Sequence, residues 1–396
     1  MNDEPIPATP ETDATPAPRW LRIEPSPTPH SSAALAEADR LMTLCNSCRY
    51  CEGVCAVFPA MEMRRVFADA DLNYLANLCH GCGACLHDCQ FAPPHPFEMN
   101  VPRTLATVRA ESYPRYAWPS ALAGLFTGNA LGVALATGIA VLVFIAGFAA
   151  NGGVDALFTP QSGPGAFYRQ MPHGAMALLF GATFIYAIVA LALSARRFWR
   201  ELHEAGGPAG VVGPTDWREA ARDAAALRYL DGGGVGCMND GDAPDDKRRR
   251  WHHLTVGGLA LCFAATGVAT LYHYLLEREA PYPWWDLPVL LGSVGGIGIV
   301  VGTIGLLAAR RRRDPALVDT AGAGMSTAFT SMLLLTALTG LALLAARETA
   351  AMGLLLAIHL GIVLGLFLSL PYGKFVHGIH RYLALVWYAR ERRLQR

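Results

Sequence analysis

The chain has 396 residues, of which 53% are hydrophobic and 16% charged, and its formal net charge is zero. This composition is lean in charge for a soluble protein and predicts a membrane-embedded part. The lack of a net basic charge argues against a nucleic-acid-binding protein. Eight of the ten cysteines lie between Cys45 and Cys89, a concentration that a metal site or a disulfide scaffold would explain.

Residues 1–34 are rich in Pro, Ala, Thr and Ser without a hydrophobic period, so they are predicted to form a disordered arm. The chain begins with acidic residues, Asp3 and Glu4, and has no basic stretch followed by an apolar run, so no secretory signal peptide is expected. The cysteines should therefore stay reduced in the cytoplasm and available to metal. Residues 35–112 alternate cysteine groups with short amphipathic stretches and predict a small helical domain.

The cysteines form two groups with the same spacing, C-x2-C-x2-C-x3-C, which ligates iron–sulfur clusters in bacterial ferredoxins. There the fourth cysteine of each run serves the other cluster. The predicted ligands of one [4Fe–4S] cluster are Cys45, Cys48, Cys51 and Cys89, and those of the second are Cys79, Cys82, Cys85 and Cys55. Zinc is the alternative, although zinc sites usually pair two C-x2-C units across a spacer. Ala56 and Gln90 replace the proline that follows the run in bacterial ferredoxins, which favours an α-helical ferredoxin-like domain.

Six apolar stretches follow, each about as long as the ~20 residues that cross a bilayer as a helix. They cover residues 120–149, 173–195, 254–276, 287–309, 325–346 and 350–372. The predicted fold is therefore mainly α, with the ferredoxin-like domain fused to a six-helix transmembrane haem-binding bundle at 113–396 that includes a cytoplasmic loop at 196–251. The glycines of residues 292–298 lie inside a span, where they favour helix packing over dinucleotide binding.

Basic residues predict the orientation. The loops on one side hold twenty Lys and Arg residues and those on the other side hold three. Because basic loops stay on the cytoplasmic side, both termini are expected inside the cytoplasmic (inner) membrane. The cysteine domain is then cytoplasmic as well.

Histidines at membrane depth are candidate haem ligands, since ionisable groups there are expensive and usually functional. The candidates are His173, His252, His253, His273, His359 and His377. At about 100° per residue, His359 and His377 would share one helix face, and His252 and His273 would lie within about 60° of each other. This pattern predicts two bis-histidine haems, one near each membrane surface. The alternative is that interfacial histidines, including His380, anchor at lipid headgroups.

Beyond the cysteine groups, residues 249–255, 269–273 and 279–283 resemble those of the tricarballylate-utilisation protein B family, also called citrate-utilisation protein B. The resemblance covers nearly everything after the arm. His359 with residues 370–377 is more distantly similar to the last helix of the nitrate reductase gamma subunit, whose two corresponding histidines ligate haem. By this likeness His359 and His377 are haem ligands, with His252 or His253 and His273 as partners and His173 as the rival on the outer side.

The resemblance implies an electron-transfer role. The donor would be the reduced flavin of an FAD-dependent tricarballylate dehydrogenase or a similar flavoprotein. The electrons would pass through two [4Fe–4S] clusters and one or two b-type haems to membrane quinone. The chain has no flavin or nicotinamide fingerprint, so it is expected to be the electron-transfer component and not the dehydrogenase itself. Two alternatives are a redox-sensing membrane protein and a subunit of another reductase, acting on heterodisulfide or nitrate.

Overall fold

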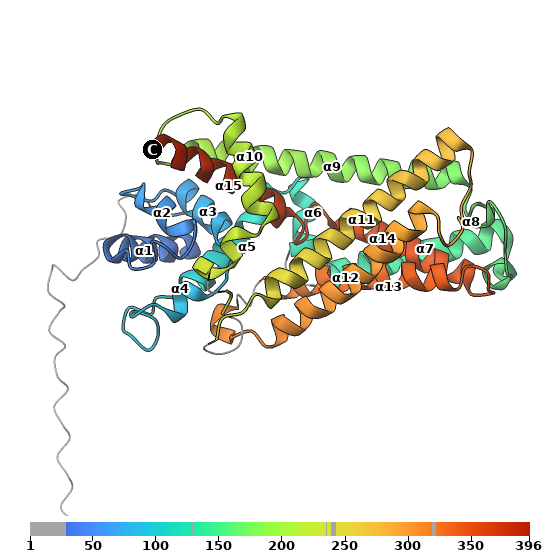
Figure 1. Cartoon of the computed structure of the whole chain (residues 1–396), viewed down its shortest axis with the longest axis horizontal. Helices are drawn as coiled ribbons and strands as arrows, with labels where there is room; N and C mark the ends of the chain where they lie inside the picture. Colours follow the sequence, from blue (N-terminus) through green and yellow to red (C-terminus); the bar gives the residue numbers. More distant parts are fainter. Residues whose placement is uncertain (1–28, 128–129, 235, 239–242, 319–321) are drawn as a thin grey trace, which may run out of the picture.

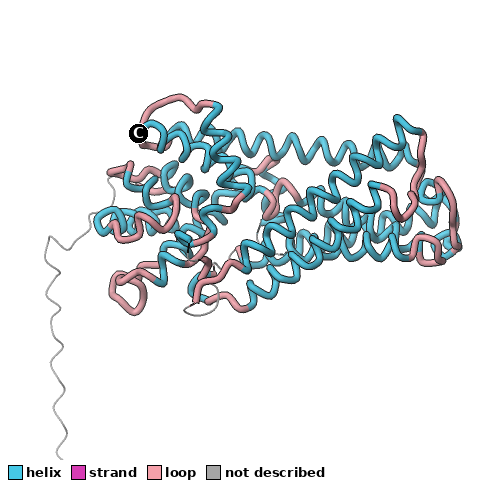
Figure 2. Tube along the Cα trace, in the orientation of Figure 1, coloured by secondary structure: helices cyan, strands magenta, loops and turns pink. Residues whose placement is uncertain are grey.

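The described part of the chain is mainly helical (Figures 1 and 2). The computed structural model describes residues 29–127, 130–234, 236–238, 243–318 and 322–396. Within these residues the only β pairing is an isolated bridge between Cys237 and Asp245. The predicted mainly α class is therefore confirmed. Residues 1–28 of the predicted arm lie outside the described part, and the first helix begins at Ala33.

A cluster of short helices carries the two cysteine groups. These helices are α1 (Ala33–Cys48), α2 (Val57–Glu62), α3 (Asp69–Leu78), α4 (Ala84–His87) and α5 (Val101–Tyr116). Ser32 caps α1 by accepting a hydrogen bond from the Leu35 amide, which satisfies a donor that the first turn leaves unpaired. Phe58, Leu72 and Tyr74 lie in the shared apolar core. The cysteine loops are thereby fixed on a helical scaffold.

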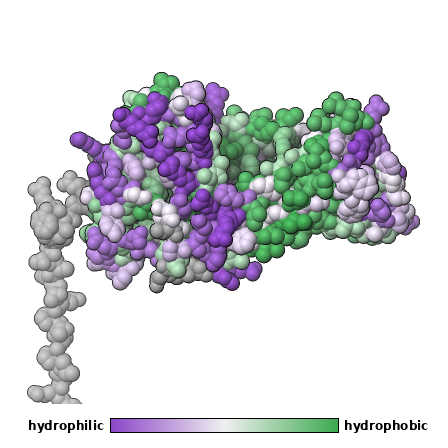
Figure 3. Space-filling view, in the orientation of Figure 1, coloured by the Kyte–Doolittle hydropathy of each residue, from purple (hydrophilic) through white to green (hydrophobic). Residues whose placement is uncertain are grey.

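Six helices in the described part of the chain are long and apolar enough to cross a membrane. They are α7 (Ala130–Gly152), α9 (His173–Glu204), α11 (Lys247–Leu276), α12 (Leu287–Arg311), α13 (Ala323–Ala345) and α14 (Met352–Ser369). The first predicted span instead divides into α6 (Ser120–Thr127) and α7, with residues 128–129 outside the described part. In α14, 56% of the apolar window is buried, against 33% or less in the others, so α14 is the central helix. The exposed apolar band (Figure 3) indicates a multi-pass membrane protein.

Glycines bring α11 and α12 into close contact. A Cβ atom added to Gly258 would lie 2.6 Å from the carbonyl oxygen of Gly295, and one added to Gly295 would lie 2.7 Å from that of Gly258. Small residues permit such approach between membrane helices. The packing role predicted for residues 292–298 is confirmed.

The sixth membrane helix does not continue to His377. It ends at Ser369, whose carbonyl accepts a hydrogen bond from the Gly373 amide in a turn, and α15 (Val376–Gln395) begins a new helix. Pro371 favours the break because it has no amide N–H to donate. The predicted alignment of His359 and His377 on one helix face is therefore wrong, since the two residues lie on different helices.

The C-terminal helix packs back onto the cysteine domain beside α10 (Pro214–Ala225) (Figure 1). Arg64 is buried there and forms ion pairs with Asp71 at 2.5 Å and Glu391 at 2.7 Å. The Tyr74 hydroxyl donates to the same Glu391 carboxylate. This network ties α15 to α3. The remaining short elements are η2 (Val154–Phe158), α8 (Ala166–Gln170), η3 (Arg228–Leu230), η4 (Gly232–Gly234) and η5 (Pro315–Leu317).

Replacing Arg64 with methionine is expected to destabilise this end of the protein by about 3–5 kcal/mol, because two carboxylates would remain buried without a counter-charge. Thermal unfolding of the purified protein in detergent measures the effect. Arg65→Met is the matched control, since Arg65 is exposed. Equal melting temperatures for the two variants would contradict a structural role for the ion-pair network.

Candidate metal centres

The first cysteine group surrounds the end of α1. Cys45 and Cys48 lie in its last turns, and Arg49, with φ of 55°, turns the chain toward Cys51. The pKa of Cys45 is raised to about 12 by burial and then by the charges of Cys51, Cys89 and Cys48. Cys89 therefore lies with the first three cysteines of this group, although it belongs to the second group in sequence.

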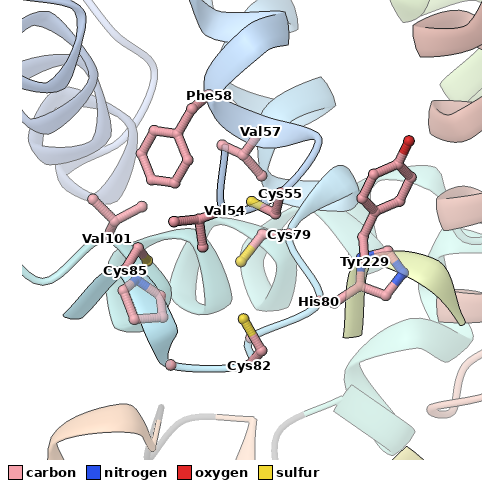
Figure 4. Close-up of a pocket in the computed structure, with 13 residues that line it drawn as sticks. Val54, Cys55, Val57, Phe58, Cys79, His80, Cys82, Cys85, Val101 and Tyr229 are labelled. Carbon is pink, nitrogen blue, oxygen red and sulfur yellow. The ribbon is translucent and has the colours of Figure 1, made fainter. Parts of the chain in front are cut away.

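The second cysteine group lies between α3 and α4, and Cys55 joins it. Cys55, Cys79, Cys82 and Cys85 line one pocket, and Figure 4 shows the sulfur atoms of Cys79 and Cys82 facing each other. Burial raises the pKa of Cys55, with further contributions from Cys82 and Cys79. Gly83 is required in this loop because its φ is +90° and an added Cβ would lie 2.7 Å from a Leu317 methyl group. The fourth cysteine of each run thus lies with the other group: Cys89 with the first and Cys55 with the second. These are the sets that were predicted as ligands.

Four-iron clusters fit these two sets better than zinc does. In the described residues no three His, Cys, Asp or Glu side chains are arranged to hold a single metal ion. A zinc ion draws its sulfur ligands to about 2.3 Å, whereas a cluster spreads its thiolates around a larger body. The ligands must be thiolates, so iron binding is expected to release protons from the thiols of both sets.

One pair of histidines fits a shared haem iron. His252 on α11 and His377 on α15 meet near the cysteine domain, with ring centroids 6.3 Å apart and planes at 88°. A metal–imidazole bond of about 2 Å on each side gives a separation of roughly 6 Å between two rings that share one ion. The His377 Nδ1 lies against the Lys374 carbonyl oxygen, which orients the ring and leaves Nε2 for a metal. The His252 Nδ1 is buried without a hydrogen-bond partner among the described residues.

A second pair lies at the opposite end of the bundle but does not fit a haem iron as placed. His173 at the start of α9 and His273 on α11 stack at 21° with ring centroids 3.6 Å apart. No iron can enter between two rings in van der Waals contact. The structure therefore brings one histidine pair to the spacing that a shared metal ion requires and places the other pair too close together for one.

The other candidate histidines lie away from these pairs. The His359 Nδ1 is 3.1 Å from the Thr339 hydroxyl, and His359 has no ring contact with another histidine in the described part of the chain. The His253 Nε2 lies 2.9 Å from a backbone carbonyl oxygen. His380 is fully buried, 3.1 Å from the Ser194 hydroxyl. His380 is therefore a core residue, so the headgroup-anchoring alternative is wrong for it.

Four arginines from four parts of the chain hold the loop that leads into the second cysteine group. Arg109 donates to the carbonyl oxygens of Ala76 and Cys79, Arg381 to that of Cys79, and Arg248 and Arg313 to that of Gly81. Lys374 lies nearby, where burial and then the charges of Arg109, Arg381, Arg248 and Arg310 lower its pKa to about 7. These cations were not predicted as site residues. A sequence signal exists, because Arg248 precedes His252 by four residues and Arg381 follows His377 by four, which places each pair on one helix face.

A helical ferredoxin-like domain at one end of six membrane helices defines an iron–sulfur electron-transfer protein of the membrane. The family models agree with this class: residues 38–115 match the citrate utilization protein B Fer4-like domain, and residues 124–396 match citrate utilization protein B. The chain belongs to the citrate utilization protein B family. It is 49% identical over 359 residues to citrate utilization protein B of Escherichia coli, covering 90% of this chain and 93% of that protein. No solved structure matches the chain.

Proposed function

We propose that this protein takes electrons from the reduced flavin of a partner dehydrogenase and delivers them to membrane quinone. The partner that the family resemblance favours is an FAD-dependent tricarballylate dehydrogenase. Two [4Fe–4S] clusters and a b-type haem, when bound, supply the one-electron chemistry that splits a two-electron flavin oxidation into single steps. The excess of basic residues in the loops at the cysteine-domain end supports a cytoplasmic location for both termini.

The observation that carries this proposal is the connection between the histidine pair and the second cysteine group. Arg248 lies on the helix of His252 and donates to the Gly81 carbonyl oxygen at 2.8 Å. Arg381 lies on the helix of His377 and donates to the Cys79 carbonyl oxygen at 2.8 Å. The two helices that present the histidines therefore also hold the cysteine loop. This direct contact between the histidine-bearing helices and the cysteine loop suits electron transfer between a cluster and a haem.

The exposure of the cysteines supports a direction for the path. Cys48 of the first group is exposed, whereas Cys79 and Cys82 of the second group are buried. A soluble donor can approach the first group from solvent. The second group lies between the first group and the membrane helices. Along the proposed path the first group is therefore the entry site and the second group is the inner site.

The test is a reduction and reoxidation cycle on the full-length protein in lipid nanodiscs under anaerobic conditions. Photoreduced flavin is the donor and a short-chain quinone is the acceptor. We expect the haem absorption bands of the reduced form to appear with the donor and to disappear with quinone, and the EPR signals of two clusters to change in parallel. Bands that stay reduced after quinone addition would contradict the proposal and favour a sensor.

A further inference from the structure

We propose that Lys374, with Arg248 and Arg381, forms a carboxylate-binding site for the propionate groups of the haem on His252 and His377. The inference rests on the proposed haem at this histidine pair. It adds which side chains bind the acidic edge of that haem. It also specifies on which side of the pair this edge lies, namely toward the second cysteine group.

The three cations are tied to the histidine pair by helix geometry. Arg248 and His252 are separated by one helical turn on α11, and His377 and Arg381 by one turn on α15, so each arginine shares a face with its histidine. Lys374 lies in the turn just before α15, and its carbonyl oxygen contacts the His377 ring. Burial and then the charges of Arg109, Arg381, Arg248 and Arg310 lower the pKa of the Lys374 ammonium group.

These positive charges lack carboxylate partners. Other arginines at this end of the molecule do have carboxylate partners, as Arg64 has in Glu391 and Arg393 has in Asp216. In the described part of the chain, neither Lys374 nor Arg248 nor Arg381 forms an ion pair. Like charges gathered in a partly desolvated space repel one another strongly, so an anion there would be stabilising.

These cations could bind either of two anions, a haem carboxylate or the iron–sulfur cluster. Lys374 favours the haem carboxylate. The two arginines already donate to the carbonyl oxygens of Cys79 and Gly81, so part of their charge faces the cysteine loop. Lys374 makes no side-chain hydrogen bond to another described residue, and its backbone carbonyl oxygen contacts the His377 ring. A haem held by two histidines carries two carboxylates at one edge, and these match an ammonium group flanked by two guanidinium groups.

The test compares two ligands on two proteins. Full-length protein made in cells that cannot synthesise haem is loaded in detergent with haem b or with its dimethyl ester, whose propionates are blocked. Transfer to apomyoglobin measures the rate of ligand loss. We expect Lys374→Gln to release haem b about tenfold faster than the unaltered protein, the effect of losing a charge-assisted hydrogen bond. The dimethyl ester should leave both proteins at the same rate, and Lys374→Arg should restore retention of haem b.

Lys247→Gln is the matched control, because Lys247 is the other lysine of the chain and its exposed side chain pairs with Asp245. It should behave as the unaltered protein does. Equal acceleration for haem b and its ester, or no acceleration for either, would overturn the carboxylate site while leaving the haem in place. If the unaltered protein binds no haem with a bis-histidine spectrum, both this inference and the haem of the proposed function fail.

Discussion

Cys55→Ser is expected to remove the cluster of the second cysteine group and to leave the first cluster intact. In sequence Cys55 belongs to the first group, but it lines a pocket with Cys79, Cys82 and Cys85. Its thiolate is therefore expected to ligate the cluster of the second cysteine group, and a serine oxygen is a poor substitute for it. Iron content should fall by half, and haem reduction by the flavin donor should stop. Iron analysis and EPR of the anaerobically purified variant measure both effects.

Cys262→Ser is the control for this experiment, because Cys262 lies within the membrane helix α11, away from both cysteine groups. Its iron content should equal that of the unaltered protein. Loss of the first cluster in Cys55→Ser, with the second retained, would show that each run of four cysteines holds its own cluster. The exchanged ligand sets would then be wrong.

His252→Ala is expected to abolish haem binding, whereas His253→Ala should keep it. The two residues are neighbours on α11, but only His252 faces His377, with ring centroids 6.3 Å apart. His253 is exposed and contacts a backbone carbonyl oxygen instead. An iron that loses one of two axial imidazoles inside a partly apolar site is held far more weakly. Pyridine haemochrome analysis gives haem per protein, and iron analysis checks that the clusters persist.

Histidine variants also show at which end of the bundle the haem binds. If His252→Ala retains haem and His273→Ala loses it, the haem lies at the opposite end, and the stacked rings of His173 and His273 must part to admit it. Loss in His253→Ala alone would mean that α11 presents a different face to the site. Each result identifies one arrangement.

The cysteine groups and the membrane helices could be predicted from the sequence because both are local patterns. Three of the four predicted ligands of each cluster lie within a few residues of each other, so the spacing of Cys79, Cys82 and Cys85 is itself evidence for the site. A membrane span needs an uninterrupted apolar run of fixed length, since the thickness of the bilayer sets it. The first predicted span divides into α6 and α7. Each of the other five coincides with one membrane helix, although α9 continues to Glu204 and α11 begins at Lys247.

The histidine pairing was decided only by tertiary structure. The angular argument assumed one straight helix from His359 to His377, and the turn after Ser369 breaks it. His377 then meets His252, more than a hundred residues earlier, because the first turns of α15 and of α11 come together.

The gathering of four arginines around the second cysteine group was also decided by tertiary structure. Arg109, Arg248, Arg313 and Arg381 are spread over most of the chain, and no local period joins them. Sequence alone was enough to predict iron–sulfur and membrane character, since cysteine spacing and apolar runs are patterns of neighbouring residues. Tertiary structure decided which histidines meet and which arginines reach the second cysteine group, because contacts between distant helices depend on how their ends turn and pack.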